Sequence, residues 1–119
     1  MLKVSKIQTF YGNIQALKDV SIEIGEGEIV TLIGANGAGK STTLMSISGV
    51  VRPRSGEIFF KEQSIHDMNS NDIVKLGISQ APEGRRIFPY LTVLENLDMG
   101  AFLRKDKLEI QKDFEYVFE

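Results

Sequence analysis

Residues 34–42, GANGAGKST, place glycines, a lysine and hydroxyl side chains in the order that a phosphate-binding loop requires. Gly34, Gly39, Lys40 and Ser41 fill the fixed positions of the pattern G-x-x-x-x-G-K-[ST]. Glycines let the backbone curl so that successive N–H groups point inward at an anion, and a following helix adds the positive end of its dipole. The Lys40 ammonium can then reach the β- and γ-phosphates, and the Ser41 hydroxyl can ligate Mg²⁺. The stretch therefore predicts a nest for a nucleotide's polyphosphate.

The flanking segments predict the elements that hold such a loop. Residues 28–33, EIVTLI, form a short apolar run rich in β-branched side chains, which is typical of a buried parallel strand. Residues 40–48 carry apolar side chains at helical spacing, and Gly49 is placed to end a helix. A strand, a glycine loop and a helix are therefore expected in this order. This context argues against the alternative, a glycine-rich turn that binds nothing.

Further short elements are expected along the chain. Strands are predicted over residues 2–9, 20–24, 57–60 and 78–80, and a short helix is predicted from Ser70 or Asn71 through Leu76. Thr92 and Glu95 have capping-box spacing, which predicts a helix to about residue 103. A second such signal at residues 106–109 precedes a helix with one apolar face, formed by Ile110, Phe114, Val117 and Phe118. This apolar stripe is still in progress at residue 119, so we expect the chain to be part of a longer domain.

Composition restricts the function classes. The chain has 119 residues and a formal charge of −2, without a basic stripe, which argues against nucleic acid as the primary partner. It has no cysteine, so a disulfide frame and a thiolate metal site are excluded. No apolar stretch approaches the ~20 residues that span a bilayer, and the start lacks the apolar core of a signal peptide. A cytosolic, soluble chain is expected.

Taken together, these residues resemble the ATP-binding subunits of ABC transporters, over the whole chain. Tyr11-Gly12 matches the family's aromatic loop, whose ring stacks on adenine, and GANGAGKST matches its phosphate loop. Gln80 matches the Q-loop glutamine, which in that family touches Mg²⁺ and the attacking water. The resemblance implies an α/β fold: a P-loop NTPase (ABC ATPase) core with an N-terminal antiparallel β region and the start of the helical subdomain, truncated. Residues 1–119 would be the N-terminal portion of one ABC ATP-binding domain. Within it, 1–90 would hold the β region, phosphate loop and Q-loop, and 91–119 would begin the helical subdomain.

The same resemblance assigns the site residues. Lys40 and Gln80 would serve catalysis, and Ser41 and Gln80 would bind the metal. The nucleotide-binding residues would be Tyr11, Gly34, Asn36, Gly37, Ala38, Gly39, Lys40, Ser41 and Thr42.

Residues 80–97, QAPEGRRIFPYLTVLENL, resemble more narrowly the ATPase subunits of the branched-chain amino acid importer. Such subunits carry a Pro-Glu-Gly-Arg segment followed by Phe-Pro and Leu-Thr-Val. The resemblance implies ATP and Mg²⁺ as cofactors, a second ABC ATPase subunit closing head to tail, and integral-membrane permease subunits, which Arg85 and Arg86 are placed to contact. It implies a location on the inner face of the cell membrane. Residues 67–74, DMNSNDIV, depart from this pattern by being more polar than expected.

Several motifs of the family have no match in the sequence. There is no Ser-Gly-Gly signature, no apolar strand ending in Asp and a catalytic Glu, and no switch histidine, since the single histidine is His66 in a polar loop. The chain therefore resembles the front half of such a domain, and we expect the 119 residues alone to hydrolyse ATP negligibly. Two alternatives stay open. One is a non-transport ABC-type ATPase that acts on nucleic acid or the ribosome. The other is a different P-loop enzyme, such as a nucleotide kinase, for which neither a Mg²⁺-holding Asp nor an acceptor pocket is found.

Overall fold

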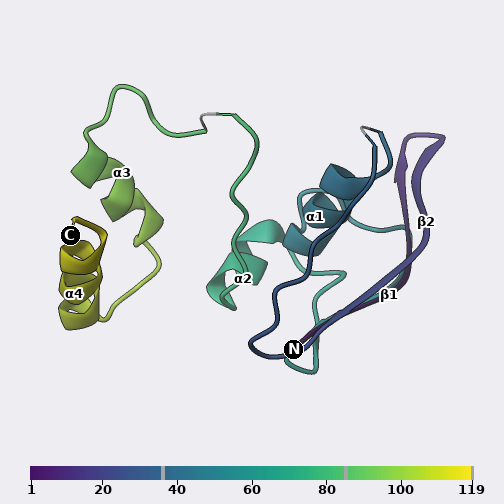
Figure 1. Cartoon of the computed structure of the whole chain (residues 1–119), viewed down its shortest axis with the longest axis horizontal. Coiled ribbons are helices and arrows are strands. Elements are labelled where there is room, and N and C mark those ends of the chain that lie inside the picture. The colour runs from purple at the N-terminus through teal and green to yellow at the C-terminus, as the bar shows by residue number, and fades with distance from the viewer. Residues whose placement is uncertain (36, 85, 119) are drawn as a thin grey trace. The chain divides into compact units, whose positions relative to one another are not determined.

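The computed structural model describes residues 1–35, 37–84 and 86–118. The chain divides into two compact units, Met1–Gln80 and Ala81–Glu119, which are described separately. The first unit contains β1 (Leu2–Tyr11), β2 (Ile14–Ile24), α1 (Lys40–Ser48), β3 (Ser55–Phe60), β4 (Gln63–Ser64) and α2 (Ser70–Lys75). The second unit contains α3 (Val93–Gly100) and α4 (Lys107–Phe118) (Figure 1).

The strands of the first unit form an antiparallel sheet in the order β2-β1-β3-β4. Strands β1 and β2 are a hairpin in which Tyr11 pairs with Ile14, so the connecting turn is the residue pair 12–13. Gly12 has a φ of 60°, as the first central position of such tight turns requires. The pairing of β1 slips next to Lys6, whose φ is 48°, and this irregularity brings Ile7 and Thr9 into the buried face after Val4.

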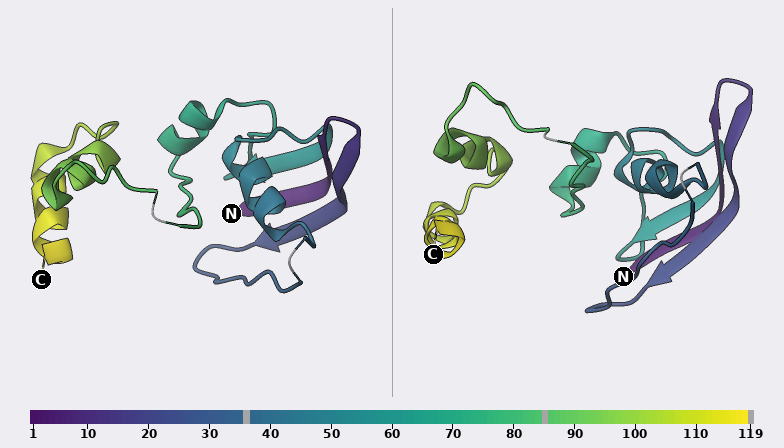
Figure 2. Two further views of the ribbon diagram at one scale, coloured as in Figure 1. Left: turned by 90° about the horizontal axis from the view of Figure 1, so that it is seen from above. Right: turned by 45° about the horizontal axis from the view of Figure 1, so that its top comes forward.

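Helix α1 lies across one face of this sheet (Figure 2) and contacts β1 and β2. Its buried side chains are mostly small, and Ile47 is its apolar contribution to the core. Gly49 ends the helix with a φ of 81° and donates its N–H to the carbonyl of Met45, which confirms the predicted helix end. The apolar core of this unit consists of Val4, Ile7, Leu17, Ile47, Ile58, Phe60, Ile65 and Ile73.

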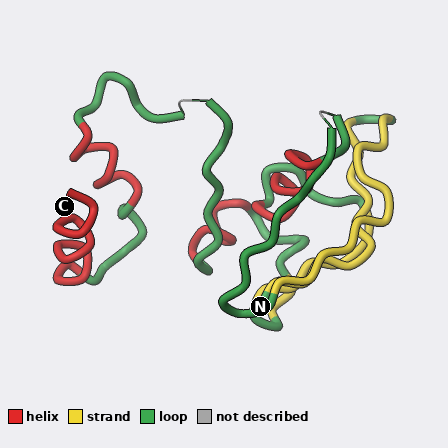
Figure 3. The backbone as a smooth tube through the Cα atoms, viewed as in Figure 1, coloured by secondary structure: helices red, strands yellow, loops and turns green. Residues whose placement is uncertain are grey.

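Two predicted strands are absent from the described structure. Residues 28–33 form a coil in the segment that leads from β2 toward α1 (Figure 3), and Ile29 and Ile33 are 97% and 94% exposed. The prediction of a buried parallel strand is therefore wrong for these 119 residues. A parallel strand is buried only when other strands pair with it, and none of the described strands pairs with this segment. Residues 78–80 are likewise coil, for the same reason.

The second unit consists of the helical pair α3 and α4. Thr92 caps α3 through the predicted capping box: its hydroxyl accepts the N–H of Glu95 at 3.1 Å, and its own N–H donates to the Glu95 carboxylate at 3.0 Å. Hydrogen bonds from Thr92 hold the pKa of Glu95 below its ordinary value of 4.5, and the bond from the Thr92 backbone N–H has the larger effect. Helix α3 ends at Gly100, before the predicted residue 103.

Helices α3 and α4 are joined by a short loop that an arginine braces. Arg104 binds the carboxylates of Asp106 at 2.7 Å and Asp113 at 2.6 Å. On the apolar side of α4, Ile110 and Phe114 are half-buried beside a groove of about 260 Å³, whereas Val117 is 58% exposed. No helix among the described residues is long and apolar enough to cross a membrane.

Candidate functional site

The segment between residue 34 and α1 is a tight loop with two glycines in the left-handed region. Gly37 has a φ of 87° and Gly39 a φ of 96°, which side chains with a Cβ rarely adopt. The N–H of Ala38 donates to the carbonyl of Ala35 at 3.1 Å, which closes a turn inside the loop. Asn36, one of the predicted nucleotide-binding residues, lies outside the described residues.

Among the described residues, no side chain caps the N-terminal end of α1 with a hydrogen bond. The first helical hydrogen bond runs from the N–H of Thr43 to the carbonyl of Gly39 at 2.9 Å. The amides of Lys40, Ser41 and Thr42 precede it, so they have no partner within the helix. Gly39 occupies the capping position and has no side chain to offer, and the first turn carries no acidic residue. Free amides and the positive end of the helix dipole together favour an anion at this end.

Lys40 lies over the same loop. Its Nζ donates to the carbonyl of Gly34 at 2.5 Å, so the ammonium is folded back across the segment that precedes the helix. A carbonyl is a neutral acceptor, and an anionic phosphate oxygen is a stronger partner for an ammonium. The lysine is therefore placed to exchange the Gly34 carbonyl for a bound anion without leaving the loop.

Gly39 fixes the loop against the sheet. A Cβ at this position would lie 2.7 Å from Cδ2 of Leu17 and 3.4 Å from the carbonyl oxygen of Ala16, both on β2. Leu17 is only 2% exposed and belongs to the core, so it has little room to move away. Close backbone approach and the positive φ both require glycine here.

Tyr11 reaches the same site from the β1–β2 turn. Its hydroxyl lies 3.4 Å from Oγ1 of Thr42, in the first turn of α1. The side chain is 45% exposed, so the ring has open surface on which a flat ligand group can stack. The structure thus brings the Tyr11 hydroxyl to Thr42, and both are predicted nucleotide-binding residues from segments far apart in the sequence.

The predicted metal ligands, Ser41 and Gln80, are not brought together. Ser41 is exposed in the first turn of α1, next to Lys40. The Gln80 amide oxygen instead accepts a hydrogen bond from the Ser48 hydroxyl at 2.9 Å, in the last turn of the same helix. At 1.5 Å per residue, the two serines are about 10 Å apart along the helix axis. Among the described residues, no three His, Cys, Asp or Glu side chains gather as metal ligands.

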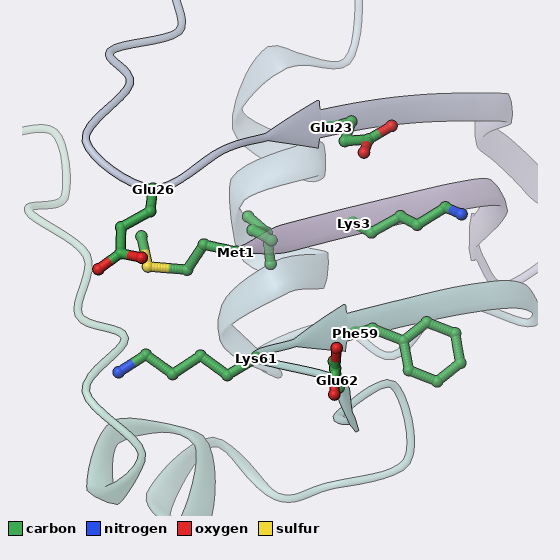
Figure 4. A pocket seen from close by; sticks show the side chains of 8 residues that line it. Met1, Lys3, Glu23, Glu26, Phe59, Lys61 and Glu62 are labelled. Atoms are coloured by element: carbon green, nitrogen blue, oxygen red, sulfur yellow. The ribbon is translucent and has the colours of Figure 1, made fainter.

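A hollow of about 860 Å³ lies at the other end of β1 from Tyr11. Its charged side chains are Lys3, Lys61, Glu23, Glu26 and Glu62. Figure 4 shows the amino groups of Lys3 and Lys61 pointing in opposite directions, and the carboxylates spread between them. Three glutamates line this hollow together with two lysines and Met1, whereas the first turn of α1 carries no acidic residue, so the end of α1 suits a polyphosphate better.

Two supporting contacts of the site were missed in the sequence. The Thr43 hydroxyl donates to the carbonyl of Gly39 at 2.8 Å, which restrains the loop from inside the helix. The guanidinium of Arg54 covers the ring of Phe10 at 3.8 Å, next to Tyr11. The spacing of residues in the sequence could not reveal these contacts. The Thr43 bond depends on the rotamer of that side chain, and the Arg54 contact joins segments far apart in the sequence.

A comparison with models of known protein families identifies the family of this chain. The family model described as "ABC transporter" matches residues 17–118. The chain belongs to the ABC transporter family. This membership and the antiparallel sheet with its helices confirm the expected fold class, that of an ABC ATPase core.

Two relatives within the ABC family have names that describe branched-chain amino acid transport. The chain is 51% identical to the high-affinity branched-chain amino acid transport ATP-binding protein BraG of Pseudomonas aeruginosa, over 95% of this chain and 49% of that protein. It is 36% identical to the probable branched-chain amino acid transport ATP-binding protein LivF of Archaeoglobus fulgidus, over 93% of this chain and 47% of that protein. The chain thus spans about half the length of the curated relatives it matches.

Solved ABC cassettes share the fold. The dimeric structure of MJ0796, a bacterial ABC transporter cassette, aligns with a TM-score of 0.81 at 28% identity, over 97% of this chain and 55% of the cassette. A second dimeric structure of MJ0796, in a post-hydrolysis state bound to ADP and Pi, aligns with a TM-score of 0.77 at 29% identity, over 89% of this chain and 49% of that one.

Proposed function

We propose that residues 34–42 bind the polyphosphate of ATP, with Tyr11 against the base. The observation that carries the proposal is the N-terminal end of α1, where three amides without helical partners follow two glycines of positive φ and the Lys40 ammonium folds back onto the Gly34 carbonyl. The 3.4 Å contact between the hydroxyls of Tyr11 and Thr42 supports the base position, because it brings the end of an aromatic side chain to the first turn of α1. The expected nucleotide contacts also include Gly34, Asn36 and Ala38.

In this proposal each group has a separate task. The loop amides orient the phosphates, Lys40 neutralises charge on the β- and γ-oxygens, and Tyr11 stacks on adenine. The exposed Ser41 hydroxyl suits a Mg²⁺ ligand, because this hard cation takes a few protein oxygens together with phosphate oxygens. When bound, Mg²⁺ would supply further charge neutralisation at the phosphates. Gln80 would join Ser41 only after its amide leaves Ser48, so its catalytic and metal-binding roles require a rearrangement of this segment.

We further propose that the protein containing these residues is the ATP-binding subunit of an importer for branched-chain amino acids. Support comes from the similarity to the branched-chain amino acid transport ATP-binding proteins BraG and LivF, at 51% and 36% identity. Such a subunit would pair with a second ABC ATPase subunit and with integral-membrane permease subunits, at the inner face of the cell membrane. In that domain, residues 1–90 would form the nucleotide-binding portion and residues 91–119 the start of the helical subdomain.

Calorimetric titration of the chain with MgATP tests the nucleotide site. We expect Lys40→Ala to weaken binding by at least tenfold, since a charge-assisted hydrogen bond contributes about 1.5–3 kcal/mol. Lys61→Ala is the matched control, because it removes the same charge from the hollow at the other end of β1. Equal affinities for the two variants would contradict the assignment of the phosphate site.

Copurification of the tagged protein from its own cells tests the transport role. Integral-membrane subunits and a second ABC ATPase should accompany it, and ATP-dependent uptake of a branched-chain amino acid should be lost in its absence. Copurification with ribosomes or nucleic acid instead would favour the alternative, a non-transport ABC-type ATPase.

A further inference from the structure

Arg54, in the loop between α1 and β3, makes two contacts with the β1–β2 hairpin. Its guanidinium carbon lies 3.8 Å from the centre of the Phe10 ring, a cation–π distance. Its Nη2 donates to the carbonyl of Gly12 at 2.9 Å. Its backbone N–H also donates to the carbonyl of Gln8 at 2.6 Å, so the residue is anchored to β1 before its side chain extends.

The two side-chain contacts fall on either side of Tyr11. Phe10 precedes this tyrosine, and Gly12 follows it in the tight turn of the hairpin. Because the backbone of residue 11 is joined directly to both contacted residues, restraining them restrains the direction of the Tyr11 Cα–Cβ bond, from which the ring extends. The Tyr11 residue is 45% exposed, and its hydroxyl makes the 3.4 Å contact with Thr42.

We call the pair of contacts that the Arg54 guanidinium makes with the Phe10 ring and the Gly12 carbonyl the clamp, and its chemistry requires an arginine. A planar guanidinium can lie on an aromatic face and still direct an N–H sideways at a carbonyl, whereas a lysine ammonium is a point charge that serves one contact at a time. Within the described ranges, no carboxylate forms an ion pair with Arg54, so its charge is directed to the ring and the turn.

We propose that Arg54 is a positioning residue for the base of the nucleotide: it holds Tyr11 in the orientation that stacks on adenine and thereby sets the preference for ATP over a base-free polyphosphate. This inference rests on the proposed nucleotide site. Arg54 has no role toward the phosphates, which belong to the loop and Lys40.

The test compares two probes, MgATP and magnesium tripolyphosphate, titrated calorimetrically into the full chain. Arg54→Met keeps the length of the side chain and removes the guanidinium. We expect it to weaken MgATP binding roughly two- to fivefold, the range of one exposed cation–π contact, and to leave tripolyphosphate binding unchanged. Arg54→Lys should recover only part of the loss. Arg52→Met is the matched control, because the Arg52 guanidinium binds Asn69 before α2 and should leave both affinities unchanged.

Tyr11→Ala separates the failure of this inference from that of the proposed site. If Tyr11→Ala weakens MgATP selectively while Arg54→Met does not, the clamp is refuted and the base site stands. If Tyr11→Ala leaves the ratio of the two affinities unchanged, the base site is wrong and Arg54 has nothing to position. An equal loss of both probes in Arg54→Met, with a lowered melting temperature, would show a purely structural role and also overturn the inference.

Discussion

Replacement of Gly39 by alanine should be among the most damaging single changes in the phosphate loop. The new Cβ would sit on a backbone with a φ of 96° and lie 2.7 Å from Cδ2 of Leu17. Backbone strain of this kind costs about 1–2 kcal/mol, and overpacking against a core side chain costs about 1–3 kcal/mol. The sum, roughly 2–5 kcal/mol, is a large fraction of the 5–15 kcal/mol that stabilises a typical domain.

Gly37→Ala provides the matched comparison. Gly37 has a similar φ of 87°, but a Cβ there would have nothing described within 4 Å. Only the strain of about 1–2 kcal/mol should remain. Urea unfolding followed by circular dichroism gives both values, and the difference between the variants isolates the collision with Leu17.

A double-mutant cycle sharpens this test. Leu17→Ala removes the δ-carbon that blocks the new Cβ, so Gly39→Ala should cost less in that background than alone, although Leu17→Ala itself destabilises the core. Unfolding free energies of Gly39→Ala and Gly37→Ala that agree within about 0.5 kcal/mol would refute the packing argument, as would a cycle without coupling.

Two further predictions concern buried and exposed hydroxyls. The Thr9 hydroxyl lies 2.9 Å from that of Ser46 inside the core, and Ser46 also donates to a backbone carbonyl. Thr9→Val should therefore cost about 1 kcal/mol in urea unfolding, and Ser46→Ala more, since it leaves the Thr9 hydroxyl without a partner; the reverse order would contradict this pairing. Thr92→Ala should raise the pKa of Glu95 part of the way to 4.5, measured by NMR titration. The pKa of Glu95 is lower in the folded chain than in the unfolded chain. The contribution of the capping box to α3 is therefore complete above about pH 4.5 and is lost as the pH falls through the folded pKa. If the pKa of Glu95 were the same in Thr92→Ala, this account of the pH dependence would be refuted.

Local signals in the sequence predicted local structure well. Gly49 ends α1 in the left-handed conformation, and Thr92 with Glu95 forms the capping box, because each depends on residues within one or two helical turns. Family membership does not depend on the strand predicted over residues 28–33, since the family model matches residues 17–118 as a whole.

The sequence by itself determined the two left-handed glycines before α1 and the lysine beside them, because a glycine's conformational freedom and a lysine's reach belong to the residues themselves. Three features were decided only by the tertiary structure. The apolar run 28–33 is coil and joins no described strand, and the Gln80 amide binds the Ser48 hydroxyl instead of lying beside Ser41. The Arg54 guanidinium lies on the Phe10 ring. A strand needs partners and a contact needs two segments in register. Both are properties of how distant parts of the chain meet, and no spacing within one segment encodes them.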